Sequence, residues 1–309
     1  MKNLHLPIRF ACSFAFLLIC AFATQAQQRV FVSGTGDDSN PCTRTSPCRN
    51  FQRGHDAVAP GGEVVALDSA GYGQVTITKS VTITGEGVMA GITAASGTNG
   101  ISIATAGITV NLRSLSIQGN GTGDHGINAT DFTVLHLEKC IVNGFANEGI
   151  LVFVSGVGTR KVFIKDSISR NNGGTGIFLA NNGGTALIAT VEGTRMVNNT
   201  NFGIDGSGPG ATVTARGCLA SGNSFIGFLS ASGAAFNIES SVASNNGTSG
   251  IATFGGGTVR VSNSTVTNNT GLGFNNNSGT FESRENNTVR GNNGGGIQTD
   301  GTITPITAL

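Results

Sequence analysis

The sequence predicts an all-β fold in which short parallel strands stack as a solenoid, and three observations lead to that prediction. A Gly-apolar pair recurs at steps of 23, 27, 27, 24, 23, 23 and 23 residues. An asparagine stands five residues before six consecutive copies of the pair. No period holds a helical pattern of useful length, whereas each holds short β-type runs between Gly, Asn and Ser. Repetition at such a period is typical of proteins whose coils stack one on the next.

The N-terminal stretch is expected to be a secretory signal peptide over 1–26 rather than part of the fold. Lys2 and Arg9 precede an apolar run, and small residues then suit cleavage after Ala26 or after Ala23. No second apolar stretch approaches membrane-spanning length, so we expect no membrane span. The sequence therefore predicts a protein that is secreted, or released into the periplasm, once this segment is removed.

Residues 27–61 are expected to form an N-terminal cap segment, and residues 62–309 the repeat domain, with about nine to ten coils. Cys42 and Cys48 lie in the turn-rich stretch NPCTRTSPCRNF of the cap. In an exported protein we expect them to form a disulfide. A metal site is the weaker alternative, because no second Cys or His pair accompanies them.

The recurring asparagines are expected to stack as a ladder, because strands of successive coils lie about 4.8 Å apart and equivalent positions then superpose. Asn tolerates the left-handed backbone of a tight turn, and its amide can bond to the coils above and below. The ladder positions are Asn172, Asn199, Asn223, Asn246, Asn269 and Asn292. The apolar residues of the recurring pair, which should fill the axis, are Ile127, Ile150, Ile177, Ile204, Phe228, Ile251, Phe274 and Ile297.

Coils such as VRVSNSTVTNNTGLGF resemble those of the right-handed parallel β-helix proteins of the pectate-lyase-like superfamily. The resemblance covers roughly residues 62–306, and the entry segment over 30–87 is similar to the start of many secreted members. It implies a right-handed, single-stranded parallel β-helix, with a short capping helix near Asn50 to Ala59 over the open end of the first coil. A bound Ca²⁺ is implied by the resemblance alone, and the residues leave the identity of any metal unknown.

The sharpest candidate site combines GTGDHGINATD with FANEGI of the next coil. His125 and Glu148 hold equivalent positions in successive coils, and Asp124 lies beneath Asn147, so two carboxylates and an imidazole are expected to converge. Such a group could perform acid–base chemistry or hold a cation. A salt-bridged surface turn is the simpler alternative, because titratable clusters are commonly structural. The candidate catalytic residues are Asp124, His125 and Glu148, and the candidate binding residues are Asn147 and Asp131.

Three further features are expected to shape the surface and the core. Two 27-residue coils lengthen one turn and should form a ridge beside Asp124 and Glu148. Cys140 and Cys218 share a column three coils apart, so they should be buried free thiols. A column of charges that alternate in sign favours an outward ionic ladder over a sugar-binding stripe, because the alternation neutralises the column. The column comprises Glu138, Lys165, Glu192, Arg216, Glu239, Ser262 and Glu285.

The sequence argues against nucleic-acid binding and leaves two candidate classes of function. The net charge of +1, with no Lys/Arg cluster, gives no footprint for nucleic acid. The catalytic signatures of lyases and hydrolases in the resembled superfamily are largely missing, and only Asp124, Asp131 and Glu148 could supply the carboxyl pair of a glycosidase. The resemblance implies a protein, expected to be a monomer, that binds or cleaves polysaccharide or a cell-surface glycan. A non-catalytic extracellular adhesion or structural module is the alternative.

Overall fold

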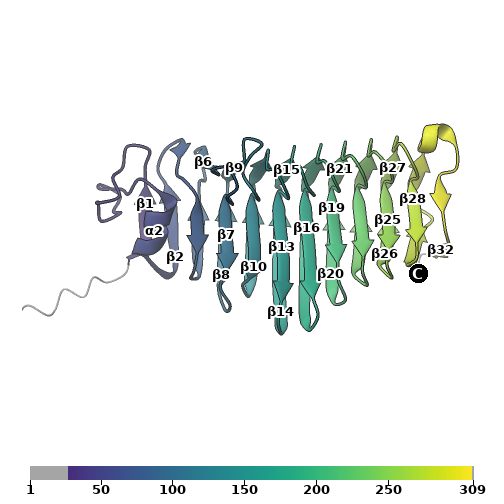
Figure 1. Ribbon diagram of the computed structural model, residues 1–309, viewed down its shortest axis with the longest axis horizontal. Coiled ribbons are helices and arrows are strands. Elements are labelled where there is room, and N and C mark those ends of the chain that lie inside the picture. Colours follow the sequence, from purple (N-terminus) through teal and green to yellow (C-terminus); the bar gives the residue numbers. More distant parts are fainter. Residues whose placement is uncertain (1–26, 308–309) are drawn as a thin grey trace, which may run out of the picture.

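The computed structural model describes residues 27–307, so the predicted signal peptide lies outside the described residues. This part of the chain is a parallel β-solenoid, in which strands of successive coils stack along the long axis (Figure 1). The strands form three sheets, which we call A, B and C, and each coil passes from sheet C through sheet A to sheet B. The all-β solenoid predicted from the repeat is therefore confirmed.

Each sheet runs the length of the solenoid and takes one strand from each successive coil. In stacking order, sheet A contains β1 (Gln27–Val32), β2 (Val58–Ala66), β5 (Val81–Thr84), β8 (Thr109–Arg113), β11 (Val134–Glu138), β14 (Gly158–Lys165), β17 (Thr185–Glu192), β20 (Ala211–Arg216), β23 (Ala235–Glu239), β26 (Thr258–Ser262), β29 (Thr280–Arg284) and β32 (Ile303–Ile306). Sheet B contains β3 (Ala70–Gly71), β6 (Ala90–Thr93), β9 (Leu115–Gln118), β12 (Ile141–Asn143), β15 (Ile168–Arg170), β18 (Arg195–Val197), β21 (Leu219–Ser221), β24 (Val242–Ser244), β27 (Thr265–Thr267) and β30 (Thr288–Arg290). Sheet C contains β4 (Val75–Ile77), β7 (Ile101–Ala104), β10 (Ile127–Asp131), β13 (Ile150–Ser155), β16 (Ile177–Asn182), β19 (Ile204–Ser207), β22 (Phe228–Ala231), β25 (Ile251–Phe254), β28 (Phe274–Asn277) and β31 (Thr299–Asp300).

The core is a set of apolar columns, because side chains alternate between the two faces of each strand. In β14, Val162 and Ile164 are buried, while Lys161, Phe163 and Lys165 point outward. Each fully buried aliphatic side chain contributes about 1.5–3 kcal/mol through the hydrophobic effect. The recurring apolar residues from Ile127 to Phe274 are also buried, so they help to hold the coils together.

The asparagine ladder is present at the turn between sheets B and C, and all six predicted members are buried. The Nδ2 of Asn199 donates to Oδ1 of Asn223 at 2.9 Å, and Asn223 donates to Asn246 at 3.0 Å. The left-handed conformation falls on the preceding residue, such as Asn198 with φ 55°, rather than on the ladder residue as expected. The left-handed turn conformation and the ladder hydrogen bond, which we expected of one asparagine, are therefore divided between two neighbouring residues.

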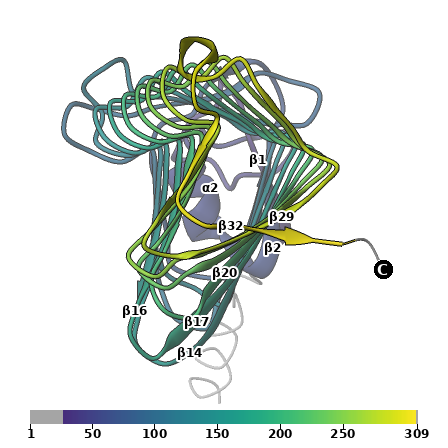
Figure 2. The ribbon, with the colours of Figure 1, turned by 90° about the vertical axis from the view of Figure 1, so that its right-hand side faces the viewer.

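A short helix, α2 (Phe51–Ala57), covers the N-terminal end of the solenoid, as the resemblance implied. Figure 2, a view along the axis, shows α2 lying across the far end of the coils. Phe51 is buried against Tyr72, with ring centroids 4.8 Å apart. The predicted disulfide between Cys42 and Cys48 is formed in the loop that leads to α2. These contacts cover core that an open solenoid would expose to water.

The last coil departs from the predicted register. Phe274 pairs with Thr299 rather than with Ile297, whose side chain is 70% exposed. The 3₁₀ turn η1 (Asn293–Gly295) shifts the chain before β31, so the final Gly-apolar pair does not reach the axis. Glu285 also leaves the charge column, because β29 ends one residue before it.

The two long coils form a ridge, made of residues 155–160 and 181–186, where sheet C turns into sheet A. Figure 1 shows this ridge extending below the neighbouring coils. Asp124 and Glu148 lie in the turns from sheet B to sheet C, at the opposite end of the strands. The ridge therefore does not stand beside them as expected; the outer surface of sheet C lies between the two features.

Candidate functional site

The first candidate site lies in two stacked turns that lead from sheet B into β10 and β13. Gly126 follows His125 directly, and a Cβ there would lie 2.2 Å from Cγ1 of Val142. The chain must therefore pass close to the core at this point, which fixes the neighbouring side chain at the surface. His125 and Glu148 are brought to the same side of the solenoid by this repeated turn.

Four predicted residues do meet at these turns. The Nδ1 of His125 lies 3.1 Å from Oδ2 of Asp124, and its Nε2 lies 3.1 Å from Oε2 of Glu148. The Nδ2 of Asn147 donates to Oδ1 of Asp124 at 2.6 Å. The Oδ1 of Asn99 is also 3.2 Å from the His125 Nδ1. The expected convergence is present as geometry, whereas a catalytic role for these residues stays a prediction.

The electrostatics of the cluster favour a charged imidazole. Burial alone would lower the pKa of His125, but the hydrogen bond to Glu148 and the charges of Asp124 and Glu148 raise it above its ordinary value. The hydrogen bond from His125 in turn lowers the pKa of Glu148, against the effect of burial. Both ring nitrogens face carboxylates, so neither is free to accept a proton from a substrate. The arrangement fits a salt-bridged turn better than a general base.

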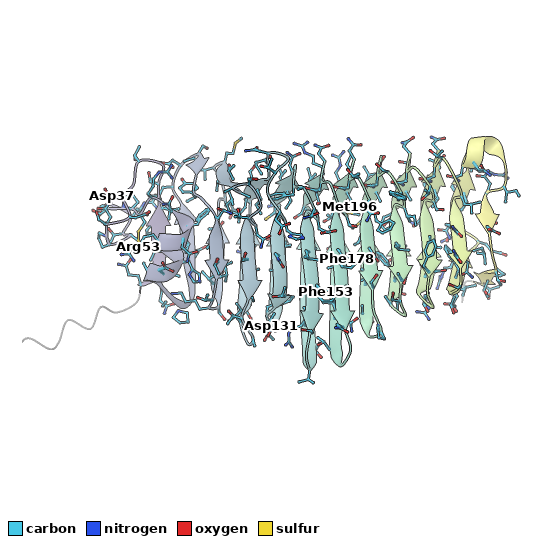
Figure 3. All side chains as sticks on the ribbon, in the orientation of Figure 1. Asp37, Arg53, Asp131, Phe153, Phe178 and Met196 are labelled. Carbon is cyan, nitrogen blue, oxygen red and sulfur yellow. A yellow bond between two sulfur atoms is a disulfide. The ribbon has the colours of Figure 1, made fainter. Side chains whose placement is uncertain are left out.

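Asp131 lies apart from this cluster, at the other end of β10 (Figure 3). Its Oδ1 accepts a hydrogen bond from Nε of Arg160 at 2.9 Å, and Nη2 of Arg160 lies 2.9 Å from the same oxygen as an ion pair. Arg160 comes from the ridge, so this pair ties the ridge to the preceding coil. The carboxylate of Asp131 therefore pairs with Arg160 and does not join Asp124 and Glu148, whereas a binding role for Asp131 stays a prediction.

The cluster does not fit the calcium site that the resemblance implied. Ca²⁺ takes six to eight oxygen ligands that converge on one point. In this cluster the imidazole of His125 occupies the space between the carboxylates of Asp124 and Glu148. Across residues 27–307, no group of three or more His, Cys, Asp and Glu side chains is placed to hold a metal ion.

The sequence interpretation missed the outer surface of sheet C next to these turns. Figure 3 shows Phe153 and Phe178 in the middle of this surface, on two adjacent strands. Phe153 is 42% exposed, and Phe178 is partly exposed. Phe202, in the turn before β19, packs with its ring 6.2 Å from that of Phe225. Apolar side chains at outward positions of a strand were the signal that could have revealed this surface.

Asp205 lies among these aromatic residues and is an unusual acid. It pairs in register with Phe178 on one side and Leu229 on the other, and its side chain is 6% exposed. Ser207 Oγ donates to its Oδ1 at 2.7 Å. Burial raises the pKa of Asp205 to about 6, although the bond from Ser207 acts in the opposite direction. An acid of this kind can hold a proton close to neutral pH.

A polar pocket continues the same surface toward the N-terminus. It has a volume of about 330 Å³ and is lined mainly by Gln52, Gln74, Thr76, Thr98, Asn99 and Ser102. Asn99 links the pocket to the cluster through its contact with His125. We call the outward surface from this pocket through Glu148 and Phe178 to Asp205 the C face.

The charged residues of sheet A form the expected ionic ladder only in part. Nε of Arg113 lies 3.7 Å from Oε2 of Glu138, and Nε of Arg216 lies 3.9 Å from Oε2 of Glu239. The charges of the column lie in register on adjacent strands, and Arg113 extends the column by one coil at its start. Lys165 and Glu192 form no ion pair within residues 27–307, so the ladder is interrupted between Glu138 and Arg216. All four paired side chains are substantially exposed, so each pair contributes little to stability.

Comparison with known proteins supports the architecture. A family model described as "Right handed beta helix region" matches residues 152–306. No curated protein matches the chain. Among solved structures, pectate lyase Pel9A aligns over 91% of this chain and 78% of that chain, with a TM-score of 0.54 and 16% sequence identity. A rhamnogalacturonan lyase aligns over 78% of this chain and 76% of its own, with a TM-score of 0.49 and 13% identity. At these identities the likeness is one of fold.

Proposed function

The chain belongs to the right-handed β-helix family, and on that premise we propose that it is an exported protein that binds a polysaccharide or cell-surface glycan along the C face. The observation that carries the proposal is the order of side chains on this face. A polar pocket, a charged turn and a group of aromatic rings on successive coils follow one another along the solenoid axis. An extended glycan lying parallel to the axis would meet each of them in turn.

The chemistry of the C face suits sugar recognition. A sugar ring presents C–H groups on its flat side and hydroxyl groups around its edge. Phe153 and Phe178 offer flat apolar surfaces to the former, and Gln74 and Asn99 offer amide donors and acceptors to the latter. Ligand sites in general combine apolar contact area with a few polar groups that fix the orientation.

The contacts of His125 favour binding over cleavage. Both nitrogens of His125 face carboxylates, so the cluster offers no free base. One observation favours cleavage as a second candidate: Asp205 has a pKa raised to about 6 by burial, and it lies on the same face as Glu148, whose pKa is lowered. A glycosidase uses an acid whose pKa is raised in this way, with a second carboxylate about 5–9.5 Å away. Glu148 precedes β13, two coils from Asp205 on β19, so the two acids do not form such a pair and Asp205 alone carries this second candidate.

Export is supported by the cysteine chemistry of the described residues. The disulfide between Cys42 and Cys48 is the kind of bond that persists in oxidising compartments. Within residues 27–307, no helix has the length and apolar character needed to cross a membrane. The disulfide, together with the predicted signal peptide, supports a location outside the cytoplasm, where polysaccharides and cell-surface glycans are found.

The experiment is a binding panel with the chain from Gln27 onward, in which pectins, alginates and neutral polysaccharides are tested by affinity electrophoresis with and without calcium. Phe178→Ala should weaken binding about tenfold, because it removes one aromatic contact surface. Val157→Ala removes an exposed apolar side chain at the tip of the ridge, 82% exposed, and should leave binding unchanged.

The same incubations separate the candidate functions when reducing ends and unsaturated ends are followed over time. Retention of a polysaccharide without product release supports a binding protein. Product release that is lost in Asp205→Asn would establish cleavage instead. Absence of retention on every polysaccharide would reject the glycan proposal and leave an adhesion or structural module with a protein partner.

A further inference from the structure

The positively charged side chains are distributed unevenly over the three sheets. Within residues 27–307, no strand of sheet C contains Lys or Arg, and neither does any turn that leads from sheet B into sheet C. Sheets A and B do contain them, as Arg216 on β20 and Arg195 on β18 illustrate. Acids are present in the same segments of the C face, namely Asp124, Glu148 and Asp205. The C face therefore carries carboxylates without any Lys or Arg of its own strands and turns.

The cations at the borders of the C face already have partners within the protein. Where sheet C turns into sheet A, Arg160 pairs with Asp131, and Nζ of Lys79 donates to a backbone carbonyl oxygen at 2.6 Å. Where sheet B ends, Nε of Arg170 donates to a side-chain oxygen of sheet B at 3.2 Å. Beside the polar pocket, Nε of Arg53 in α2 donates to a backbone carbonyl oxygen of the cap at 2.9 Å. These contacts hold the four cations away from a ligand on the C face.

His125 is the one basic side chain of the C face itself. Its two ring nitrogens lie 3.1 Å from carboxylate oxygens of Asp124 and Glu148. One imidazolium balances one carboxylate at most, and the pKa of about 6 leaves most of Asp205 ionised near pH 7. The C face is therefore negatively charged at neutral pH.

Hydroxyl groups and acidic groups of a sugar interact with such a surface in opposite ways. A hydroxyl group can donate to a carboxylate, and a hydrogen bond to an ionised group is stronger than one between neutral groups. The side chains of Asp124 and Glu148 are 35% and 24% exposed, so a ligand can reach them as acceptors. A sugar carboxylate or sulfate accepts only and is usually held by Arg or Lys, which the C face lacks. Like charges brought together at an interface also lower affinity.

We propose that the glycan bound by the C face is uncharged, with sugar rings that carry hydroxyl groups and no carboxylate or sulfate groups. This inference rests on the proposed function of the C face and names the substrate class of that site. Acidic polysaccharides are excluded because Asp124 and Glu148 repel them and no cation compensates. A cationic sugar is not required, because His125 already lies between these two carboxylates and would compete with an ammonium group for them.

The test compares glycans that differ only in charge, by affinity electrophoresis of the chain from Gln27 onward. Each neutral polysaccharide that retards the protein is carboxymethylated, and a hydroxyethylated form controls for the size of the added group. Highly methyl-esterified pectin is compared in the same way with the pectate made from it. We expect the carboxymethylated form to bind about tenfold more weakly than the hydroxyethylated form in dilute buffer. The difference should shrink in about 0.3 M NaCl, because salt screens the repulsion.

A cation introduced on the C face should relax this selectivity. Thr76 is exposed on β4 and lines the polar pocket, so Thr76→Lys should raise the affinity for the carboxymethylated form about tenfold. Thr280→Lys is the matched control, because Thr280 is an exposed threonine on β29 of sheet A. It adds the same charge away from the C face and should leave the selectivity unchanged. Retention is assigned to the C face only where Phe178→Ala weakens it.

The outcomes separate this inference from the function on which it rests. Absence of retention on every polysaccharide rejects the proposed function. Retention that Phe178→Ala weakens, but that is equal for the carboxymethylated and hydroxyethylated forms, overturns the uncharged substrate class alone. Pectate bound more tightly than methyl-esterified pectin, with or without calcium, overturns it as well. Tighter binding of a glucosamine polymer than of its N-acetylated form would also overturn it, in favour of a cationic glycan.

Discussion

The Nε2 atom of His125 lies 3.1 Å from Oε2 of Glu148, which belongs to the next coil. This contact joins two successive turns by their side chains, in addition to the backbone bonds that stack them. Because the imidazole is held between two carboxylates, its protonated, charged form strengthens both contacts. The stability of these turns should therefore depend on pH.

Glu148→Gln should lower the free energy of unfolding by about 1 kcal/mol at pH 5.5, where both partners are charged. The raised pKa of His125 makes its contribution complete below the ordinary value of 6.5 and lost as pH rises through the folded-state pKa. The lowered pKa of Glu148 makes its contribution complete above 4.5 and lost as pH falls through the folded-state pKa. The effect of the substitution should thus be largest between those values and shrink by pH 8.5.

Urea unfolding of both proteins at pH 5.5 and pH 8.5 measures this difference. Glu192→Gln provides the control, because Glu192 is an exposed acid of sheet A that forms no ion pair within residues 27–307. An equal loss of stability at the two pH values would show that the imidazole charge plays no part.

Asn223→Ala should cost about 2–3 kcal/mol of stability, because it interrupts the ladder and leaves buried donors without partners. The Oδ1 of Asn223 accepts bonds from both the backbone N–H and the Nδ2 of Asn199. Asn201 lies in the same turn region and its side chain is partly exposed. Asn201→Ala should therefore lower the free energy of unfolding by less than about 0.5 kcal/mol. Urea unfolding midpoints would compare the two, and similar losses would contradict a special role for the ladder.

The repeat made the coils, the ladder and the turn cluster predictable, because stacking converts sequence spacing directly into proximity. The pair Gly100–Ile101 could have been added to the series in the same way, because Ile101 pairs in register with Ile127. The end of the repeat was not predictable, because η1 inserts residues in a turn and spacing alone does not show where the register resumes. The C face was missed for another reason: Phe178 and Asp205 occupy equivalent positions with different chemistry, so no recurring residue marks them.

The chain from Gln27 onward should show no thiol that reacts with Ellman's reagent while folded. Cys140 and Cys218 are buried and free, and burial raises the pKa of each thiol to about 11. Unfolding in urea should expose these two thiols, and added reductant should release two more from Cys42 and Cys48. Reactive thiols in the native protein would mean that the coils around Cys140 and Cys218 open readily.

Reduction of the disulfide alone should lower the free energy of unfolding by about 2 kcal/mol, because the loop it closes is short.

Asp205→Asn should stabilise the protein by about 2 kcal/mol at pH 8, because it removes a buried charge that has one hydrogen-bond partner. The raised pKa means that the folded state favours the protonated acid, so stability is complete below the ordinary value of 3.8 and falls as pH rises through about 6. The advantage of the variant should therefore disappear near pH 4. Asp300 is an exposed acid at the C-terminal end of the same sheet C column, so Asp300→Asn should show no such gain in stability.

Urea unfolding at both pH values tests this prediction. An Asp205→Asn variant that is less stable than the parent at pH 8 would show that the carboxylate has a stabilising partner in solution. If Asp205→Asn is both more stable and weaker in glycan binding, then the chain keeps a destabilising acid on the C face for its function, which is the trade expected at a binding or catalytic site.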